Sequence, residues 1–223
     1  MTAELPAELA SDQLAALLCA RLCHDLVSPV SALGAALSVL DDQDSSDMHD
    51  DAMELVRESA RQAQAKLEFA RLAFGAGGSA PAMLDTRELQ RLTEAMFSAV
   101  KPQIVWKVEA AGLEKTSARL LLNLAIMGVD AAPRGGTVTI EATDNGGNAR
   151  IRVVSEGPRA RLEEAAGVAL DGGIPENGLD GRSIQPFYTG LIARTAGGRV
   201  SGRVDEERVE FAALVDAPEG MIG

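Results

Sequence analysis

Two long stretches of helical periodicity open the chain, and they constrain its fold more than any other feature. Apolar residues recur every three or four positions from residue 12 to residue 40 and again from residue 48 to residue 74. Asp12 is of a residue type that favours a helix N-cap. The acidic segment between the two stretches, DDQDSSD at 41–47, is typical of a turn. We therefore predict a helical hairpin over residues 1–76.

Each predicted helix carries apolar side chains along one side when residues are placed about 100° apart. In the first helix these residues are Leu14, Leu18, Leu22, Leu26, Val30, Leu33, Leu37 and Leu40. In the second helix they are Met53, Val56, Ala60, Ala63, Leu67, Ala70 and Phe74. Such a hairpin has more apolar surface than one partner helix covers, and pairing two hairpins into a four-helix bundle would bury it. We expect a homodimer, with a monomeric hairpin packed on the rest of the chain as the alternative.

A change in composition divides the chain after this hairpin. The segment GAGGSAPA at 75–82 predicts a linker at 77–82 and a second domain at 83–223. Strand-like runs follow at 104–109, 137–143, 151–155, 199–204 and 209–215, and helical runs at 86–100, 116–131 and 184–196. The segment DNGGN at 144–148 is a β-hairpin signal. This mixture predicts an α+β protein whose mostly antiparallel sheet is covered by helices on one face.

Composition excludes several function classes. The chain has 21 Lys and Arg against 33 Asp and Glu, a formal net charge of −12, and its basic residues are scattered, so we expect no nucleic-acid partner. The longest apolar run, 120–129, is far shorter than the ~18 residues of a membrane span, and the acidic start lacks the basic residues of a secretory signal. Cys19 and Cys23 are interpreted as reduced thiols that serve packing, and with His24 they lack a fourth zinc ligand. We expect a cytoplasmic protein that binds no membrane and no metal.

One histidine lies almost opposite the apolar side of the first predicted helix. By the same 100° count, His24 points away from that side, and Arg21, Ser28 and Ser31 lie near it. An exposed histidine is usually an ordinary surface residue. The residues that follow it make a chemical role more plausible.

Asp25 and Pro29 give this histidine an unusual context. A proline inside a helix costs about 3 kcal/mol and is tolerated more readily where a bend is useful. A neutral imidazole can use one ring nitrogen as a nucleophile while the other donates a hydrogen bond, which Asp25 is placed to accept. This chemistry fits phosphoryl transfer through a phosphohistidine.

The run His24-Asp25-Leu26-Val27-Ser28-Pro29 resembles the H-box of sensor histidine kinases. Residues 116–140 resemble the N-box region of the kinase ATP-binding domain, and Asn123 matches its first asparagine. By the same resemblance, Met127 stands where a second asparagine holds magnesium, and Ser155 stands where an aspartate binds adenine. A thioether cannot replace an amide oxygen on magnesium. The resemblance therefore implies a degenerate nucleotide pocket at Asn123, Met127, Ser155 and Gly157 that no longer binds ATP.

An intact H-box beside a degenerate pocket resembles the ChpT-type histidine phosphotransferases of alphaproteobacteria. The supporting runs are 20–25 (ARLCHD), 71–76 (RLAFGA) and 157–162 (GPRARL), and the resemblance covers nearly the whole chain. It implies a dimeric four-helix bundle followed by a degenerate histidine-kinase-like (Bergerat) α/β sandwich. It also implies a phosphorelay, with a CckA-like hybrid kinase as donor and CtrA-like and CpdR-like response regulators as acceptors. No cofactor is expected on this chain, and Mg²⁺ is expected on the receiver domain of the partner.

The resemblance also gives expected roles to the residues near the H-box. His24 is the expected phosphoacceptor, and Asp25 orients it unless it only solvates the helix. Arg21 stabilises the phosphoryl group or pairs with Asp25 one turn on. Ser28 is a candidate for positioning water in receiver dephosphorylation. The candidate receiver-docking residues are Leu17, Val27, Ser31, Arg159 and Arg161, with ordinary surface residues as the alternative.

Two other functions remain open from the sequence. One is an ATP-dependent histidine kinase whose pocket has drifted, which requires nucleotide binding. The other is a structural dimer or binding module in which His24 is incidental.

Overall fold

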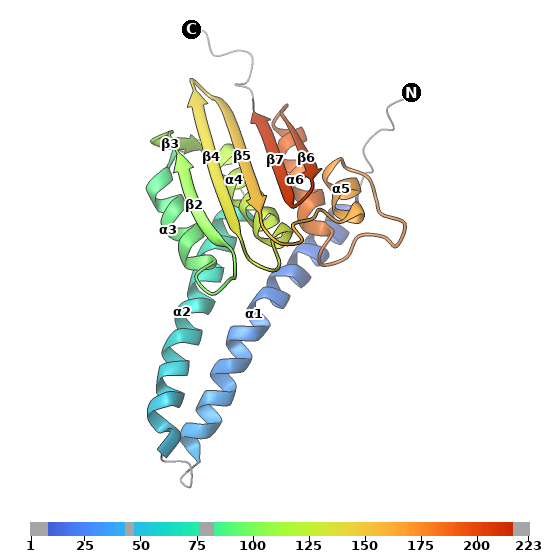
Figure 1. Cartoon of the computed structure of the whole chain (residues 1–223). Helices are drawn as coiled ribbons and strands as arrows, with labels where there is room; N and C mark the ends of the chain where they lie inside the picture. Colours follow the sequence, from blue (N-terminus) through green and yellow to red (C-terminus); the bar gives the residue numbers. More distant parts are fainter. Residues whose placement is uncertain (1–8, 43–46, 76–82, 216–223) are drawn as a thin grey trace.

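The computed structural model describes residues 9–42, 47–75 and 83–215. Its first two helices, α1 (Ser11–Asp41) and α2 (His49–Ala73), run side by side and form a stem that projects from the rest of the molecule (Figure 1). The predicted helical hairpin is confirmed. The proposed N-cap is wrong, because α1 begins at Ser11 and Ala10 takes the cap position without a side-chain bond. The predicted linker at 77–82 lies outside the described residues.

A five-stranded sheet forms the body of the molecule, in the order β2-β4-β5-β7-β6. Its strands are β2 (Gln103–Val108), β4 (Thr137–Asn145), β5 (Asn148–Glu156), β6 (Arg199–Asp205) and β7 (Arg208–Val215). Strand β2 pairs parallel to β4 and the other three pairings are antiparallel, which agrees with the mostly antiparallel sheet predicted from the sequence. The β4–β5 hairpin closes at the predicted place, where Asn145 pairs with Asn148 and both intervening glycines have positive φ.

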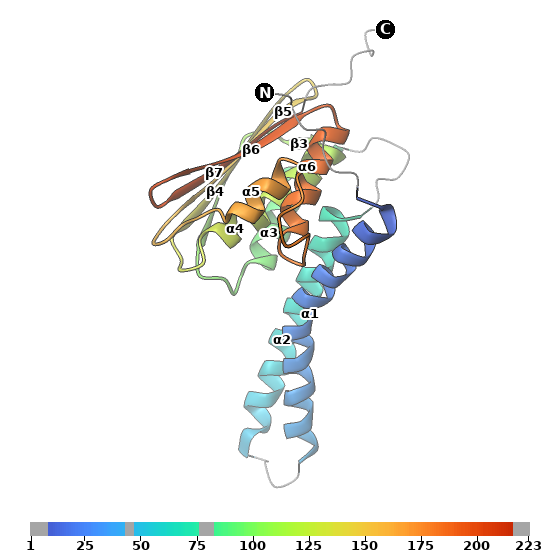
Figure 2. The same cartoon turned by 90° about the vertical axis from the view of Figure 1, so that its right-hand side faces the viewer.

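Helices cover one face of this sheet, as predicted, and Figure 2 shows the other face without them. The main covering helices are α3 (Thr86–Met96), α4 (Lys115–Ala131) and α6 (Ile184–Thr195), with the short α5 (Glu164–Leu170) beside α6. Helix α3 ends four residues before the predicted boundary. The two-stranded sheet of β1 (Met83–Asp85) and β3 (Gly112–Glu114) was not predicted, because three-residue strands are too short for an alternating pattern.

The stem and the sheet domain share one hydrophobic core. Helix α4 is buried along most of its length between the sheet and the end of α2. Phe69 of α2 is fully buried and meets Phe97 edge to face, with ring centroids 5.7 Å apart. Leu14 and Leu18 of α1 pack against the same core, beside α6. The first half of α1 and the last half of α2 are therefore part of the globular body.

The far half of the stem is covered on one side only. Pro29 and Ala36 are the buried residues of α1 in the described chain, whereas Val30 and Leu37 are 56% and 50% exposed. On α2, Met53 is exposed in this half, and Leu67, nearer the sheet domain, is 50% exposed as well. Helix α1 is long and apolar enough to cross a membrane by length and composition alone, which the count of consecutive apolar residues did not detect. Only 11% of its most apolar stretch is buried, so packing against α2 and α6 leaves most of this apolar surface exposed.

Candidate functional site

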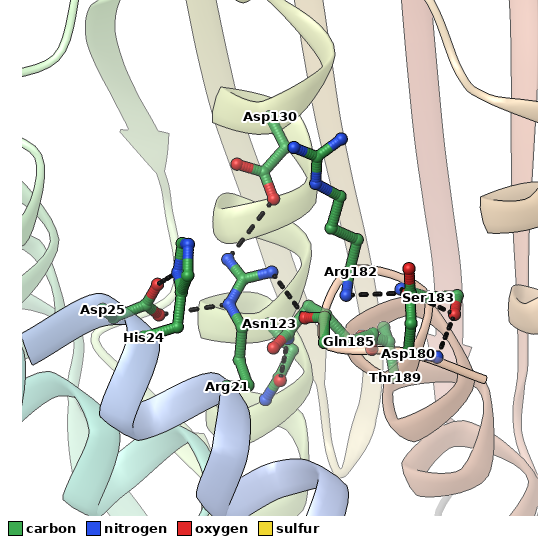
Figure 3. Close-up of polar contacts among 11 residues, drawn as sticks. Arg21, His24, Asp25, Asn123, Asp130, Asp180, Arg182, Ser183, Gln185 and Thr189 are labelled. Carbon is green, nitrogen blue, oxygen red and sulfur yellow. Dashed lines mark hydrogen bonds and ion pairs between the residues drawn. The ribbon is translucent and has the colours of Figure 1, made fainter. Parts of the chain in front are cut away.

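His24 stands on α1 where the stem meets the sheet domain, with its side chain 85% exposed. Its Nδ1 lies 3.3 Å from Oδ1 of Asp25 (Figure 3). When Nδ1 carries the proton, it donates a hydrogen bond to the carboxylate of Asp25, and the other ring nitrogen, Nε2, keeps its lone pair. The outward orientation agrees with the helix count from the sequence, and it presents a nucleophilic nitrogen to solvent.

Arg21 lies one turn before His24 and joins three parts of the fold. Its Nε donates to Oδ2 of Asp25 at 3.1 Å, and its two terminal nitrogens reach Asp130 of α4 and the carbonyl of Gly181, each at 3.5 Å (Figure 3). Burial lowers the pKa of Arg21, but the carboxylates of Asp130 and Asp25 outweigh it, so the pKa is raised and the guanidinium stays charged. The ion pair with Asp25, left open by the sequence, is present. The bridge to Asp130 was not foreseen.

Replacing Arg21 with methionine is expected to lower the free energy of unfolding by about 1–3 kcal/mol. The Arg21 side chain is only 13% exposed, and its loss leaves two nearby carboxylates without their shared donor. Urea unfolding followed by circular dichroism measures the change. Arg61→Met is the matched control, because Arg61 is exposed on α2 and bonds only its own helix in the described structure. Equal midpoints for the two variants would contradict the bridging role.

A cavity of about 400 Å³ opens beside His24, between α1 and the sheet domain. Helix α4 contributes Met127 and Asp130 to it, and the segments on either side of α5 contribute Arg161 and Arg182. The remaining lining residues are Arg21, His24, Asp25, Ala131, Pro133, Leu162, Glu163, Ala166, Pro186 and Phe211. In the part of the chain that the structure describes, no group of three His, Cys, Asp or Glu side chains is placed to hold a metal ion. The cavity combines apolar surface with three arginines and three acidic residues, so its positive and negative charges are balanced.

The residues assigned to the degenerate nucleotide pocket are occupied by contacts within the fold. Asn123 is fully buried, and its amide donates to the carbonyl of Ala73 at 2.9 Å and accepts from Gln185. Ser155 is also fully buried, and its hydroxyl donates to the carbonyl of Gly128 at 2.7 Å. Asn123 thus ties the end of α2 to α4 and α6.

The other two residues of this pocket are also committed to packing. Met127 is 4% exposed. A side chain at Gly157 would place its Cβ 2.3 Å from the backbone oxygen of Gly135, so the two turns touch there. Neither residue presents a free polar group to a ligand.

Four of the five predicted docking residues are exposed. Val27 is 60% exposed, and Ser31, Arg159 and Arg161 are also at the surface, as is Ser28. Arg161 meets Glu163 at 3.3 Å. Leu17 is only half-exposed: it packs against the buried cluster of Ala169, Ile184 and Phe187, because α1 lies on α6 there, and this leaves less of it for a partner. Leu17 therefore stabilises the contact between α1 and α6.

The structure adds two residues near His24 and corrects the interpretation of two others. Neither Asp130 nor Lys66 was predicted from the sequence as a site residue. Lys66 Nζ donates to the backbone carbonyl of Asp25 at 2.7 Å. The sequence did contain one indication that such a donor is needed: Pro29 has no N–H, so a carbonyl one turn earlier lacks its partner in the helix. Cys19 and Cys23 are free and exposed, so they do not serve packing in this chain.

Comparison with known proteins gives a family for this arrangement. Residues 86–208 match the family "Histidine phosphotransferase C-terminal domain". The protein phosphotransferase ChpT of Brucella abortus (strain 2308) is 37% identical over 209 residues, which cover 94% of this chain and 99% of that protein. The chain therefore belongs to the ChpT-type histidine phosphotransferases. A solved structure described as that of a bacterial phosphotransferase also matches this phosphotransferase, with a TM-score of 0.83 and 35% identity, covering 94% of this chain and 100% of the other.

The family match spans the sheet domain and its helices, from α3 to the start of β7, while His24 stands outside it on α1. The two full-length comparisons extend across the stem of the phosphotransferase as well. Membership establishes histidine phosphotransfer as the activity of the family. The histidine that carries the phosphoryl group, and the partners that exchange it, have to be inferred from the chemistry of the site.

Proposed function

We propose that His24 carries the phosphoryl group in a multistep phosphorelay. Its Nε2 attacks the phosphorus of an aspartyl phosphate on a donor receiver domain, the P–O bond breaks to release the aspartate carboxylate, and the Nδ1 proton passes to solvent. Attack by an aspartate carboxylate of a second receiver breaks the P–N bond, and the imidazole takes a proton back from solvent, which restores the histidine. The observation that carries this proposal is an 85% exposed imidazole whose Nδ1 faces the carboxylate of Asp25 at the mouth of a cavity.

The transferred group passes through a loose transition state, so transfer depends mainly on alignment and charge neutralisation. Asp25 fixes the tautomer of His24, and Arg21 holds Asp25 in place from the other side. We assign the magnesium of the reaction to the receiver domain. The hydroxyl of Ser28 lies one turn beyond His24 and is a candidate for directing water at a receiver phosphate.

We infer that this phosphotransferase does not use ATP. The positions that resemble the kinase nucleotide pocket are filled by protein contacts: Asn123 holds the end of α2, and Ser155 bonds the backbone of α4. A nucleotide would have to break these buried hydrogen bonds, at a cost of about 1–3 kcal/mol for each group left unpaired.

We propose that a receiver domain docks across α1 and the sheet domain at the same time. Val27 and Ser31 present the α1 side of this surface, and Arg159 and Arg161 present basic groups from the segment after β5. Arg159 has a positive φ of 60°, and its N–H donates to Glu207 at 3.2 Å, which fixes that segment. The expected partners are the receiver domain of a CckA-like hybrid kinase and those of CtrA-like and CpdR-like regulators.

We also propose that the stem forms the four-helix bundle of a homodimer. Val30 and Leu37 are seven residues apart on α1, and Met53 and Leu67 are fourteen apart on α2. Ala36 is buried on α1 and Ala52 on α2, and each serves as the zero angle of its helix. When residues are placed about 100° apart from these two, both exposed pairs lie on the same flank of the hairpin. His24 falls on the opposite flank by the same count, so pairing through this stripe leaves the imidazole accessible.

The test of the function uses two phosphoryl sources. The purified chain is incubated with a phosphorylated receiver domain and, separately, with radiolabelled Mg-ATP. We expect acid-labile label on the chain in the first case only. Label acquired from ATP without any other kinase would contradict this and support a histidine kinase with a drifted nucleotide pocket. No label from either source would also contradict it and favour a binding module in which His24 is incidental.

A further inference from the structure

Pro29 creates an unmet hydrogen bond in the middle of α1. In an α-helix the N–H at position 29 would donate to the carbonyl at position 25, and proline has no N–H. The proline ring also crowds that carbonyl and turns it away from the helix axis. Helix α1 nevertheless continues unbroken from Ser11 to Asp41, and Pro29 itself is buried against the stem. The carbonyl of Asp25, one residue after His24, therefore needs a donor from outside the helix.

Lys66 of α2 supplies that donor. Its Nζ lies 2.7 Å from the backbone oxygen of Asp25, a distance typical of a charge-assisted hydrogen bond. The Lys66 side chain is half-buried between the helices and forms no ion pair in the described part of the chain. Among the described residues, Lys66 thus donates to the one carbonyl that Pro29 leaves without a partner in the helix.

We propose that Lys66 is a positioning residue for phosphoryl transfer, which replaces the missing N–H of Pro29 and so fixes the backbone that aims His24. Arg21 holds the carboxylate of Asp25 and Lys66 holds its carbonyl, so the residue that faces the imidazole is fixed at both ends. Figure 2 shows the darker, N-terminal part of α1 inclined to the lighter part that forms the stem. The bend and its cross-helix bond place His24 at the junction with the sheet domain. This inference rests on the proposed role of His24.

The inference predicts a specific coupling between Lys66 and Pro29. Lys66→Met in the natural background leaves the Asp25 carbonyl unpaired, and we expect transfer at saturating phosphorylated receiver to slow about tenfold. Receiver affinity is expected to stay within about twofold, because Lys66 lies between the helices and not on the docking surface. In a Pro29→Ala background the helix provides its own N–H for the carbonyl. There, Lys66→Met is expected to change the rate by less than about twofold.

The experiment compares four chains, namely the natural one, Lys66→Met, Pro29→Ala and the double variant, with Arg61→Met as the control for the loss of one positive charge on α2. Single-turnover transfer from a phosphorylated receiver gives the rate, a binding titration gives the affinity, and urea unfolding gives the same coupling without any phosphate chemistry. If the natural chain takes no label, the proposed function fails, and the unfolding coupling still decides the role of Lys66.

A slower Lys66→Met chain whose defect disappears in the Pro29→Ala background, with a matching coupling in unfolding, supports the proposal. An equal defect in both backgrounds overturns it, as does a Lys66→Met chain as fast as the natural one. If Lys66→Met fails to fold, the double variant must fold for the proposal to stand. An Arg61→Met chain as slow as Lys66→Met would assign the effect to lost charge and would also overturn it.

Discussion

Replacing His24 with glutamine is expected to abolish uptake of phosphoryl from a phosphorylated receiver, to below about one thousandth of the natural rate. Glutamine has a similar reach and hydrogen-bonding capacity, but its amide nitrogen is not a nucleophile. Because the His24 side chain is 85% exposed, the substitution removes almost no packing. The urea midpoint and the oligomeric state should therefore be unchanged, which separates a chemical defect from a folding defect.

The chain contains its own control for this experiment. It has only two histidines, and the second, His49, begins α2 at the far end of the stem, where its ring lies 3.5 Å from the carbonyl of Asp42. His49→Gln should take up acid-labile label at the natural rate. Label that persists in His24→Gln, or disappears in His49→Gln, would show that the phosphoacceptor has been misassigned.

Placing aspartate at both Val30 and Leu37 is expected to convert the proposed dimer to a monomer. These side chains are 56% and 50% exposed in the isolated chain and stand on the stripe proposed to close the bundle. Two copies would bring four carboxylates into a largely apolar interface, and burying an unpaired charge costs several kcal/mol. The dissociation constant should rise by more than about a hundredfold, which corresponds to ~2.8 kcal/mol. Sedimentation velocity over a concentration series measures it.

The matched control for the dimer is Ala35→Asp. Ala35 is exposed on the same helix, but by the 100° count it lies on the flank that carries His24. This variant should remain dimeric at all concentrations at which the natural chain does. A natural chain that sediments as a monomer would contradict the proposed four-helix bundle, as would a double aspartate variant that still dimerises. Either result would favour the alternative, a monomeric hairpin packed on the sheet domain.

The sequence was informative where a local pattern determines the structure. The apolar periodicity of α1 predicted both the stem and the outward direction of His24, and DNGGN predicted the β4–β5 turn. It was less informative where a distant partner determines the outcome. Leu17 is apolar and was a docking candidate, and only the contact of α1 with α6 shows that it is partly buried within the chain.

The residues around His24 illustrate the same limit. Arg21 and Asp25 are one turn apart, so their ion pair was one of the two roles that the sequence allowed for Arg21. Asp130, 109 positions from Arg21, could not be foreseen. Lys66 is 41 positions from Asp25. Loss of the nucleotide pocket was expected from single residue changes. The hydrogen bonds that Asn123 forms with Ala73 and Gln185 could not be predicted, because both partners are distant along the chain.

The core shared by the stem and the sheet domain has a consequence for signalling traffic. Because Phe69, Asn123 and Arg21 tie the two parts together, a receiver docked as proposed would meet one fixed surface rather than two parts that hinge. With His24 as the proposed phosphoacceptor, donor and acceptor receivers would occupy the same place in turn, and each would exclude the other from that histidine. Flux through such a carrier depends on how quickly the first receiver departs, so a tightly held donor would slow the pathway as effectively as a scarce one.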